Sequence, residues 1–226
     1  MILFHGSPVI VKEPSLEKGK PYNDYGQGFY CTQDIDLAKE WACKEGTDGY
    51  VNQYELDDSD LKILNLNDKH PLCWVAILLK HRTFNVSNEI AKQAREYIIN
   101  KFYIDVKEYD LVIGYRADDS YFSYANSFIS NNLSLQSLVY AMKLGDLGYQ
   151  VALVSKKAFE NLKYMNAEKA DASIYFVKYD NRDKQARKEY KESLNNHLFD
   201  LLDLFVLDII RERMELDDER LQGIIF

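Results

Sequence analysis

The chain has 226 residues, of which 46% are apolar and 28% are charged. This length allows one large domain with a full hydrophobic core, or one domain with an appendage. The formal net charge of -8 excludes a global positive field that would bind nucleic acid without regard to sequence.

Neither the N-terminal sequence nor the cysteines indicate secretion or metal binding. The N-terminus enters strand-like sequence without a basic leader, and no apolar run approaches the roughly 18 residues of a membrane span. Cys31, Cys43 and Cys73 have no C-x-x-C spacing, so we expect free thiols rather than a disulfide framework or a zinc site. These features predict a cytoplasmic protein without a metal.

The first third of the chain predicts short strands around one helix. A loop rich in Pro, Gly and Lys is expected at residues 8–25, and a helix is expected to begin after the N-cap Asp34 and to stop at Gly46. Strands are expected at residues 1–7, 28–32, 51–56 and 61–66.

The middle of the chain mixes both kinds of element. Apolar spacing predicts helices at residues 87–102, 135–142 (closed by Gly145) and 155–162. Strands are expected at residues 110–115, 150–154 and 172–179. Because strands and helices do not alternate regularly, the predicted fold class is α+β, with residues 1–180 as the main domain.

After Tyr179 the composition changes to a charged run, which is typical of a solvated helix face or a linker. The following segment, residues 198–210, is too apolar to face water on all sides, so we expect a helix that is mostly buried. Residues 181–226 are therefore predicted to be a helical extension that packs on the main domain or, alternatively, contacts a partner.

One set of spaced residues points to chemistry. His5-Gly6-Ser7 ends the first strand, Gly28-Phe29-Tyr30 forms the second, and Trp41 follows Tyr30 by eleven residues. Two aromatic rings can hold a nicotinamide ring, with stacking worth roughly 0.5–1.5 kcal/mol per pair, and a histidine can bind a ribose hydroxyl. A structural histidine and a hairpin with core aromatics are the alternative reading.

These residues resemble the first two motifs of the ADP-ribosyltransferase superfamily in its His-Tyr-Glu branch. The wider frame, which adds Val112-Ile113-Gly114 and Ala117-Asp118-Asp119, is similar to the bacterial domain-of-unknown-function family 3990 over about residues 1–165. The resemblance implies a split β-sheet core with peripheral helices and NAD as co-substrate.

The resemblance also implies roles for single residues. His5 would contact the adenosine-side ribose, and the Gly6 backbone would bind the carboxamide. Tyr30 and Trp41 would stack on the nicotinamide beside Gly28, and Ser7 would contact phosphate or ribose. Gln150 stands where the branch places its catalytic glutamate, and Ala38 stands where the polymerases have a serine.

A glutamine cannot carry charge or act as a general base, so chain elongation to poly(ADP-ribose) is not expected. Asp118 and Asp119 are the leading substitute acids and Glu55 is a third, although a solvated turn and an exposed edge carboxylate are the alternatives. Arg116 would neutralise a pyrophosphate or pair with Asp118. A Cys31 nucleophile has no assignable partner histidine.

The predicted function is mono-ADP-ribosylation of a macromolecular acceptor, protein rather than nucleic acid, chosen by loops at residues 8–23 and 118–133. By analogy, the enzyme would be the toxin of a toxin-antitoxin or defence system with an antitoxin partner. A catalytically inactive module that binds NAD or ADP-ribose is the alternative. A tRNA 2′-phosphotransferase is a third possibility, which the acidic charge and the lack of an arginine cluster disfavour.

Overall fold

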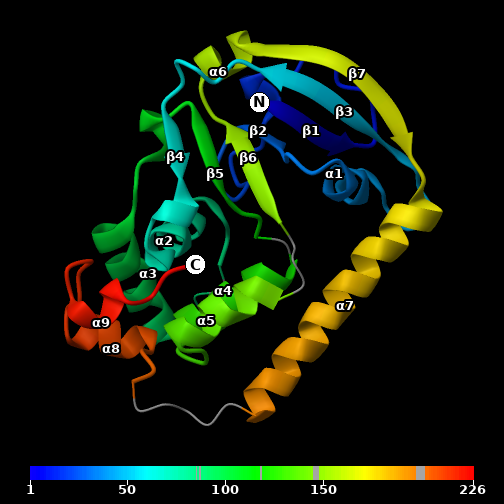
Figure 1. Cartoon of the computed structure of the whole chain (residues 1–226). Coiled ribbons are helices and arrows are strands. Elements are labelled where there is room, and N and C mark those ends of the chain that lie inside the picture. The colour runs from blue at the N-terminus through cyan, green and yellow to red at the C-terminus, as the bar shows by residue number, and fades with distance from the viewer. Residues whose placement is uncertain (85, 87, 118, 145–147, 197–201) are drawn as a thin grey trace.

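The computed structural model describes the chain except for residues 85, 87, 118, 145–147 and 197–201. It contains a three-stranded sheet and a four-stranded sheet, with helices around them (Figure 1). The predicted α+β class is confirmed at this level.

The smaller sheet is antiparallel throughout, in the order β1-β3-β7. The larger sheet has the order β2-β6-β5-β4, and only its β4–β5 pair is parallel. The strands are β1 (Ile2–Ser7), β2 (Phe29–Cys31), β3 (Gly49–Leu56), β4 (Ile63–Asn65), β5 (Leu111–Tyr115), β6 (Tyr149–Leu153) and β7 (Leu162–Ala170).

The two sheets meet where β1 runs past the end of β2. Phe4 and Thr32 exchange both of their backbone hydrogen bonds, with N···O distances of 2.7 and 2.9 Å. Further along β1 the two strands separate, and His5 and Gly6 lie at this split. The split is therefore built by the two strands that carry the first two sequence motifs.

Nine α-helices surround the sheets in the part of the chain that the structure describes. They are α1 (Ile35–Ala42), α2 (Pro71–His81), α3 (Glu89–Phe102), α4 (Asp119–Ile129), α5 (Leu135–Lys143), α6 (Lys156–Glu160), α7 (Ala172–Asn196), α8 (Val206–Arg211) and α9 (Glu219–Gln222). Short 3-10 turns lie at Leu16–Lys18, Leu66–Asp68 and Val106–Glu108. None of the described helices has the length and apolar character that a membrane crossing requires.

Helix α1 starts as the sequence predicts. The Asp34 carboxylate accepts hydrogen bonds from the backbone N–H groups of Asp36 and Leu37, which satisfies donors that a helix start leaves free. The helix ends at Ala42, before the predicted stop at Gly46. It packs closely on β1 and β3 and thereby carries Trp41 to the split.

The strand predicted at residues 172–179 is wrong. Residues 172–179 begin α7 instead of forming a strand, because Asp171 caps the helix by accepting from the Ser173 N–H, and Asp48 accepts from the Ala172 N–H. The strand next to β3 is β7, at Leu162–Ala170. Its side chains are largely exposed, so the sequence carried no clear alternation.

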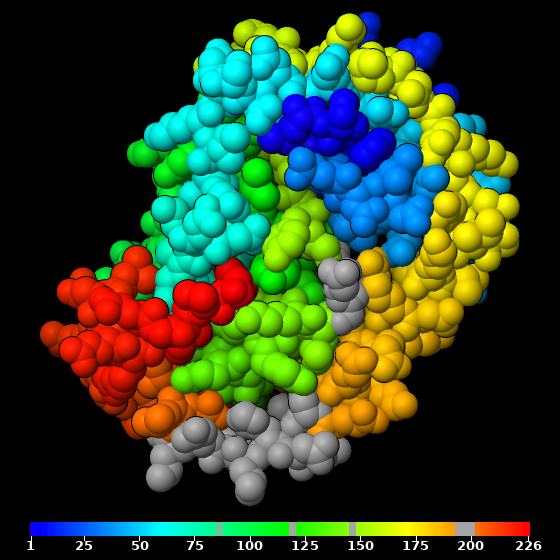
Figure 2. All heavy atoms as spheres, in the orientation of Figure 1, coloured from blue at the N-terminus to red at the C-terminus, as the bar shows by residue number. Residues whose placement is uncertain are grey.

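The apolar segment at residues 198–210 is not one continuous helix. Within its described part only α8 is helical, and residues 202–205 form an irregular connection. Leu204, Val206 and Ile209 are nevertheless buried in the core that contains α2 and α3. Figure 2 shows the residues from 202 to the C-terminus, in orange-red and red, packed against the body of the molecule. The domain boundary predicted at residue 180 falls inside α7, which runs through it unbroken.

Two helices were missed in the sequence. Helix α2 is apolar on all sides and almost wholly buried, so it lacks the amphipathic period that reveals a surface helix. Helix α4 occupies most of residues 119–133, so the loop expected there is wrong. The expected role of this segment in choosing the acceptor stays a prediction. Gly145, the predicted end of the helix at residues 135–142, lies outside the described residues.

Candidate functional site

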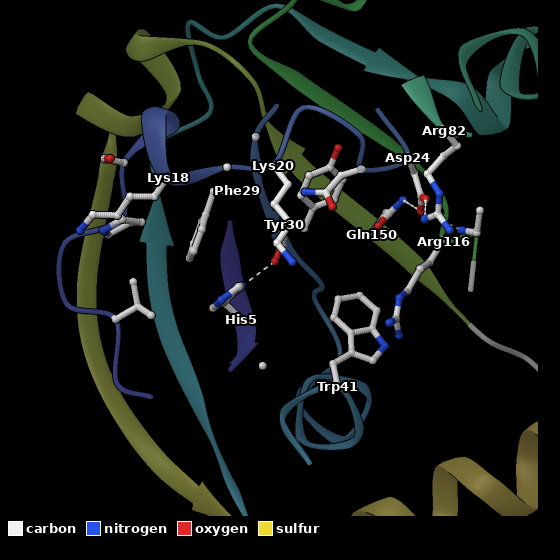
Figure 3. A pocket seen from close by; sticks show the side chains of 18 of the residues that line it. His5, Lys18, Lys20, Asp24, Phe29, Tyr30, Trp41, Arg82, Arg116 and Gln150 are labelled. Carbon is white, nitrogen blue, oxygen red and sulfur yellow. Dashed lines mark hydrogen bonds and ion pairs between the residues drawn. The ribbon is translucent and has the colours of Figure 1, made fainter. Parts of the chain in front are cut away.

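A pocket of about 580 Å³ opens at the split between the two sheets (Figure 3). Of the predicted site residues, it brings together His5, Gly6, Gly28, Tyr30, Trp41 and Gln150. Phe29, Asp24, Arg82, Arg116, Lys18 and Lys20 also line it. Residues from strands, helices and loops therefore converge on one site.

The His5 ring is held in one orientation and one tautomer. Its Nδ1 lies 2.7 Å from the carbonyl oxygen of Tyr30, and the ring packs on Phe29 at 4.2 Å between centroids. Because a carbonyl only accepts, Nδ1 must carry the proton. Burial lowers the pKa of His5, which favours the neutral ring. Nε2 is then left as a hydrogen-bond acceptor for a ligand hydroxyl.

The ring and the hydroxyl of Tyr30 make different contacts. The hydroxyl donates to the Gly26 carbonyl at 2.7 Å and accepts from the Tyr25 N–H at 3.0 Å, so it closes the turn that precedes β2. Burial raises the pKa of Tyr30, which keeps the hydroxyl protonated. The hydroxyl is thus structural, and the ring is the part that lines the pocket.

Trp41 projects from α1 into the pocket, as Figure 3 shows. The guanidinium carbon of Arg116 lies 4.6 Å from the centroid of its ring. A cation over an indole is attracted by the negative face of the ring. Arg116 therefore pairs with Trp41 in this structure. The alternative partner, Asp118, lies outside the described residues.

Gly6 has two reasons to lack a side chain. A Cβ there would lie 2.1 Å from the Ala38 carbonyl oxygen, so α1 could not pack at its present distance. The Gly6 N–H and C=O also point to the same side as those of Phe4, because backbone direction alternates along a strand. This side faces the split, where a ligand carboxamide could bind.

The pocket contains a carboxylate that the sequence reasoning missed. Asp24 is 5% exposed, and its Oδ1 accepts from Arg82 Nη1 at 2.7 Å. Its Oδ2 accepts from the Ala117 N–H and from Gln150 Nε2, each at 2.9 Å. Burial raises the pKa of Asp24, while Gln150, Arg82 and Ala117 oppose that rise.

The electrostatics of the pocket differ from those of the whole chain. Lys18, Lys20, Arg82 and Arg116 line it, and Asp24, which pairs with Arg82, is its one acidic lining residue in the described part of the chain. The net charge of the chain is -8. The pocket therefore favours an anionic ligand.

Three predicted residues whose side chains the structure describes, Ser7, Glu55 and Cys31, do not join this site. The Ser7 hydroxyl donates to the Val9 carbonyl and accepts from the Val9 N–H, and it does not line the pocket. Glu55 is exposed on β3, away from the pocket. Cys31 is fully buried, and burial raises its pKa, so a thiolate is disfavoured. Asp119 begins α4, and its side chain is not described.

The missed residues differ in the signal that they carried. Asp24 is the first residue of the motif that contains Tyr30, so its place in the sequence was a signal. Its hydrogen bond with Gln150 joins residues 126 positions apart, and no local pattern indicates such a contact. Arg82 follows the missed helix α2, and Lys18 and Lys20 lie in a segment that reads as an ordinary loop. Among the described residues, no group of three or more His, Cys, Asp or Glu is placed to hold a metal ion.

Comparison with known proteins gives one match. A model of a protein family of unknown function, DUF3990, matches residues 1–164, which include both sheets up to the start of β7 and all of the pocket except Tyr179. No curated protein and no solved structure matches the chain significantly. Because the match covers more than half of its length, the chain belongs to the DUF3990 family of proteins of unknown function.

Proposed function

We propose that this protein is a mono-ADP-ribosyltransferase that uses NAD. The observation that carries the proposal is the convergence of His5, Tyr30 and Trp41 on one pocket at the split between two sheets. In the proposed reaction, the bond between the nicotinamide nitrogen and the ribose carbon C1′ breaks. Nicotinamide leaves with the bonding electron pair, an acceptor atom bonds to C1′, and the acceptor proton goes to solvent.

Each part of NAD has a matching group in the pocket. The rings of Tyr30 and Trp41 offer flat apolar surface for nicotinamide, and the Gly6 backbone faces the same space. The unprotonated Nε2 of His5 can accept from a ribose hydroxyl. Lys18, Lys20 and Arg116 carry the positive charge that a diphosphate needs.

The chemistry of Gln150 limits the reaction. Since an amide cannot take a proton from the acceptor, the acceptor must already be nucleophilic or be activated elsewhere. We therefore propose transfer of a single ADP-ribose, with a protein as acceptor, and no elongation to a polymer. A toxin or defence role with a cognate antitoxin follows from analogy with the superfamily.

A second candidate function rests on Gln150 and Asp24. Gln150 is neutral, and Asp24 accepts hydrogen bonds from Gln150, from the Ala117 N–H and from Arg82, so no described carboxylate in the pocket is free to act as a base. Such a pocket could bind NAD or ADP-ribose without turnover. Saturable NAD binding without nicotinamide release would favour this binding module.

The test follows both products of the proposed reaction. The protein is incubated with a bacterial lysate and NAD labelled in the ADP-ribose part, and nicotinamide release is measured beside label transfer. The expected result is transfer by the wild type and a loss of at least tenfold in Tyr30→Ala. Tyr140→Ala, which truncates an exposed tyrosine on α5, is the matched control and keeps full activity. A wild type that neither releases nicotinamide nor transfers label contradicts the proposal.

A further inference from the structure

The side-chain amide of Gln150 is fixed at one end. Its Nε2 donates to Asp24 Oδ2 at 2.9 Å and to the Tyr115 carbonyl at 3.4 Å. These two contacts use both N–H groups of the amide. Figure 3 shows the amide nitrogen directed at Asp24 and the amide oxygen directed away from it.

The opposite orientation of the amide is excluded by the same contacts. If the amide were turned by 180°, Oε1 would face the Asp24 carboxylate and the Tyr115 carbonyl, and neither of these groups can donate a hydrogen bond. Gln150 is 3% exposed, so water could not relieve these contacts cheaply. The hydrogen-bond network thus decides which atom Gln150 presents.

Asp24 and the Tyr115 carbonyl are themselves held in place. Arg82 and the Ala117 N–H bind the carboxylate of Asp24. The Tyr25 hydroxyl and Trp74 Nε1 donate to the Tyr115 carbonyl at 2.6 and 3.0 Å. Both acceptors that hold Gln150 are therefore supported by buried contacts of their own, as a preorganised site requires.

We propose that Asp24 is a positioning residue that makes Gln150 a pure hydrogen-bond acceptor, so that Oε1 receives a hydrogen bond from a ribose hydroxyl of the ligand. This inference rests on the proposed function, because NAD supplies the hydroxyl. Gln150 then does one part of what a carboxylate would do: it accepts from the hydroxyl but cannot take its proton. The negative charge lies on Asp24, which in this proposal contacts Gln150 and not the ligand.

The network also predicts what a restored glutamate would do. Gln150→Glu would place a carboxylate about where Nε2 now lies, 2.9 Å from Asp24 Oδ2. Two carboxylates at this distance cannot both ionise, so one must hold a proton or the side chains must separate. The glutamate is therefore expected to destabilise the fold at neutral pH, and its cost is expected to shrink on acidification.

The groups around Asp24 add little pH dependence of their own to the stability in this range. The charged and titratable groups that act on Asp24 are Arg82, Arg116, Tyr25 and Tyr30. Burial raises the pKa of both tyrosines, so neither hydroxyl titrates between about pH 5 and pH 8.

The first arm of the test uses the protein without ligand. Thermal unfolding of wild type, Gln150→Glu and the control Gln53→Glu is followed from about pH 8 to about pH 5. Gln53 Oε1 accepts from Asn166 on the neighbouring strand β7, which a glutamate can also do, so the control is expected to follow the wild type. The expected result is a loss of stability in Gln150→Glu that shrinks as the pH falls. A loss that is independent of pH overturns the proposed positioning.

The second arm measures the affinity for NAD and for an analogue with fluorine in place of the 2′-hydroxyl of the nicotinamide ribose. The wild type is expected to bind the analogue about tenfold more weakly, which corresponds to about 1.4 kcal/mol. In Asp24→Asn the two ligands are expected to bind nearly alike, because the amide of Gln150 is no longer oriented. Asp217→Asn, which removes an exposed carboxylate, is expected to keep the tenfold ratio.

The two arms separate the possible failures. If the ratio of the affinities for NAD and for the fluorinated analogue is the same in the wild type and in Asp24→Asn, the inference about Asp24 is overturned. NAD binding by the wild type would in that case still support the proposed pocket. If the wild type does not bind NAD at all, the proposed function fails and the ribose contact fails with it. The pH dependence of Gln150→Glu then still decides whether Asp24 and Gln150 are coupled.

Discussion

At the scale of single residues, Tyr30 shows how one side chain serves both the fold and the pocket. Its hydroxyl satisfies the Tyr25 N–H and the Gly26 carbonyl, and its ring lines the cavity. The neighbouring Gly26 has a φ of +82°, a conformation that L side chains rarely adopt. The hydroxyl therefore stabilises a turn that the backbone alone would form less readily.

Tyr30→Phe separates these two roles. The change keeps the ring but leaves a partly buried N–H and carbonyl without their partner, which costs about 1–3 kcal/mol in the free energy of unfolding. Denaturant unfolding measures this loss, and the affinity for NAD, measured without denaturant where the variant is folded, is expected to change less than threefold. An unchanged free energy of unfolding would show that the hydroxyl does not support the turn.

The local motifs lie on short strands and on the first helix, and the structure brings their residues His5, Tyr30, Trp41 and Gln150 to one pocket. The roles of these residues stay predictions. The sequence could not reveal Asp24 as the partner of Gln150, since that contact depends on how β6 and the loop before β2 approach each other. A hydrogen bond between residues so far apart in the sequence leaves no local pattern from which it could be predicted.

At the scale of elements, the packing of α1 on β1 determines where Trp41 lies. The helix approaches so closely that a Cβ at Gly6 would lie 2.1 Å from one backbone oxygen and 2.7 Å from the Ala42 nitrogen. Backbone atoms of a packed helix cannot move aside as a flexible side chain can. The absence of a side chain at Gly6 therefore fixes the distance between helix and sheet.

Gly6→Ala tests this packing. We expect a loss of about 1–3 kcal/mol or more, because the helix must shift to make room. The same substitution at Gly223, where no atom lies within 4 Å of the added Cβ and φ is -81°, is expected to be neutral or slightly stabilising. Chemical denaturation of the two variants gives the comparison. A Gly6→Ala protein as stable as Gly223→Ala would contradict the described packing.

Elements with a clear apolar period were predicted correctly, and those without one were not. Strands β1, β2, β5 and β6 and helix α3 follow their patterns. The start of α7 reads as a strand because it is rich in aromatic and β-branched residues, yet Ile174 and Val177 are about half exposed on a helix. Capping by Asp171 outweighs that local preference.

At the scale of the whole molecule, His70 connects two distant helices. Its Nδ1 accepts from the Leu72 N–H at the start of α2, and its Nε2 lies 3.1 Å from the Leu221 carbonyl of α9. Burial lowers the pKa of His70 to about 4. A protonated ring would lose the acceptor that caps α2, so acid is expected to weaken this connection.

The sign of the pH effect follows from proton binding. The unfolded chain takes up a proton at His70 near pH 6.5 and the folded chain only near pH 4, so stability falls as the pH drops through this window. One full proton gives a slope of at most about 1.4 kcal/mol per pH unit. His70→Asn, which keeps a good N-cap, is expected to reduce this slope.

Comparison of the two proteins isolates His70. Burial also lowers the pKa of His5 and His81, and it raises the pKa of Asp24 and Glu40, but these groups are present in both proteins. Unfolding free energies measured at several pH values between about 4 and 7 give the two slopes. Identical slopes would mean that His70 is not buried as described.

The most direct test of the central claim is the fluorescence of Trp41 during a titration with NAD. The chain has two tryptophans: Trp41 lines the pocket, whereas Trp74 is fully buried and donates to a backbone carbonyl. A nicotinamide ring bound against Trp41 is expected to quench its emission in a saturable way, and Trp41→Phe is expected to lose this quenching. No saturable change, or the same change in Trp41→Phe, would contradict the proposal that this pocket binds NAD.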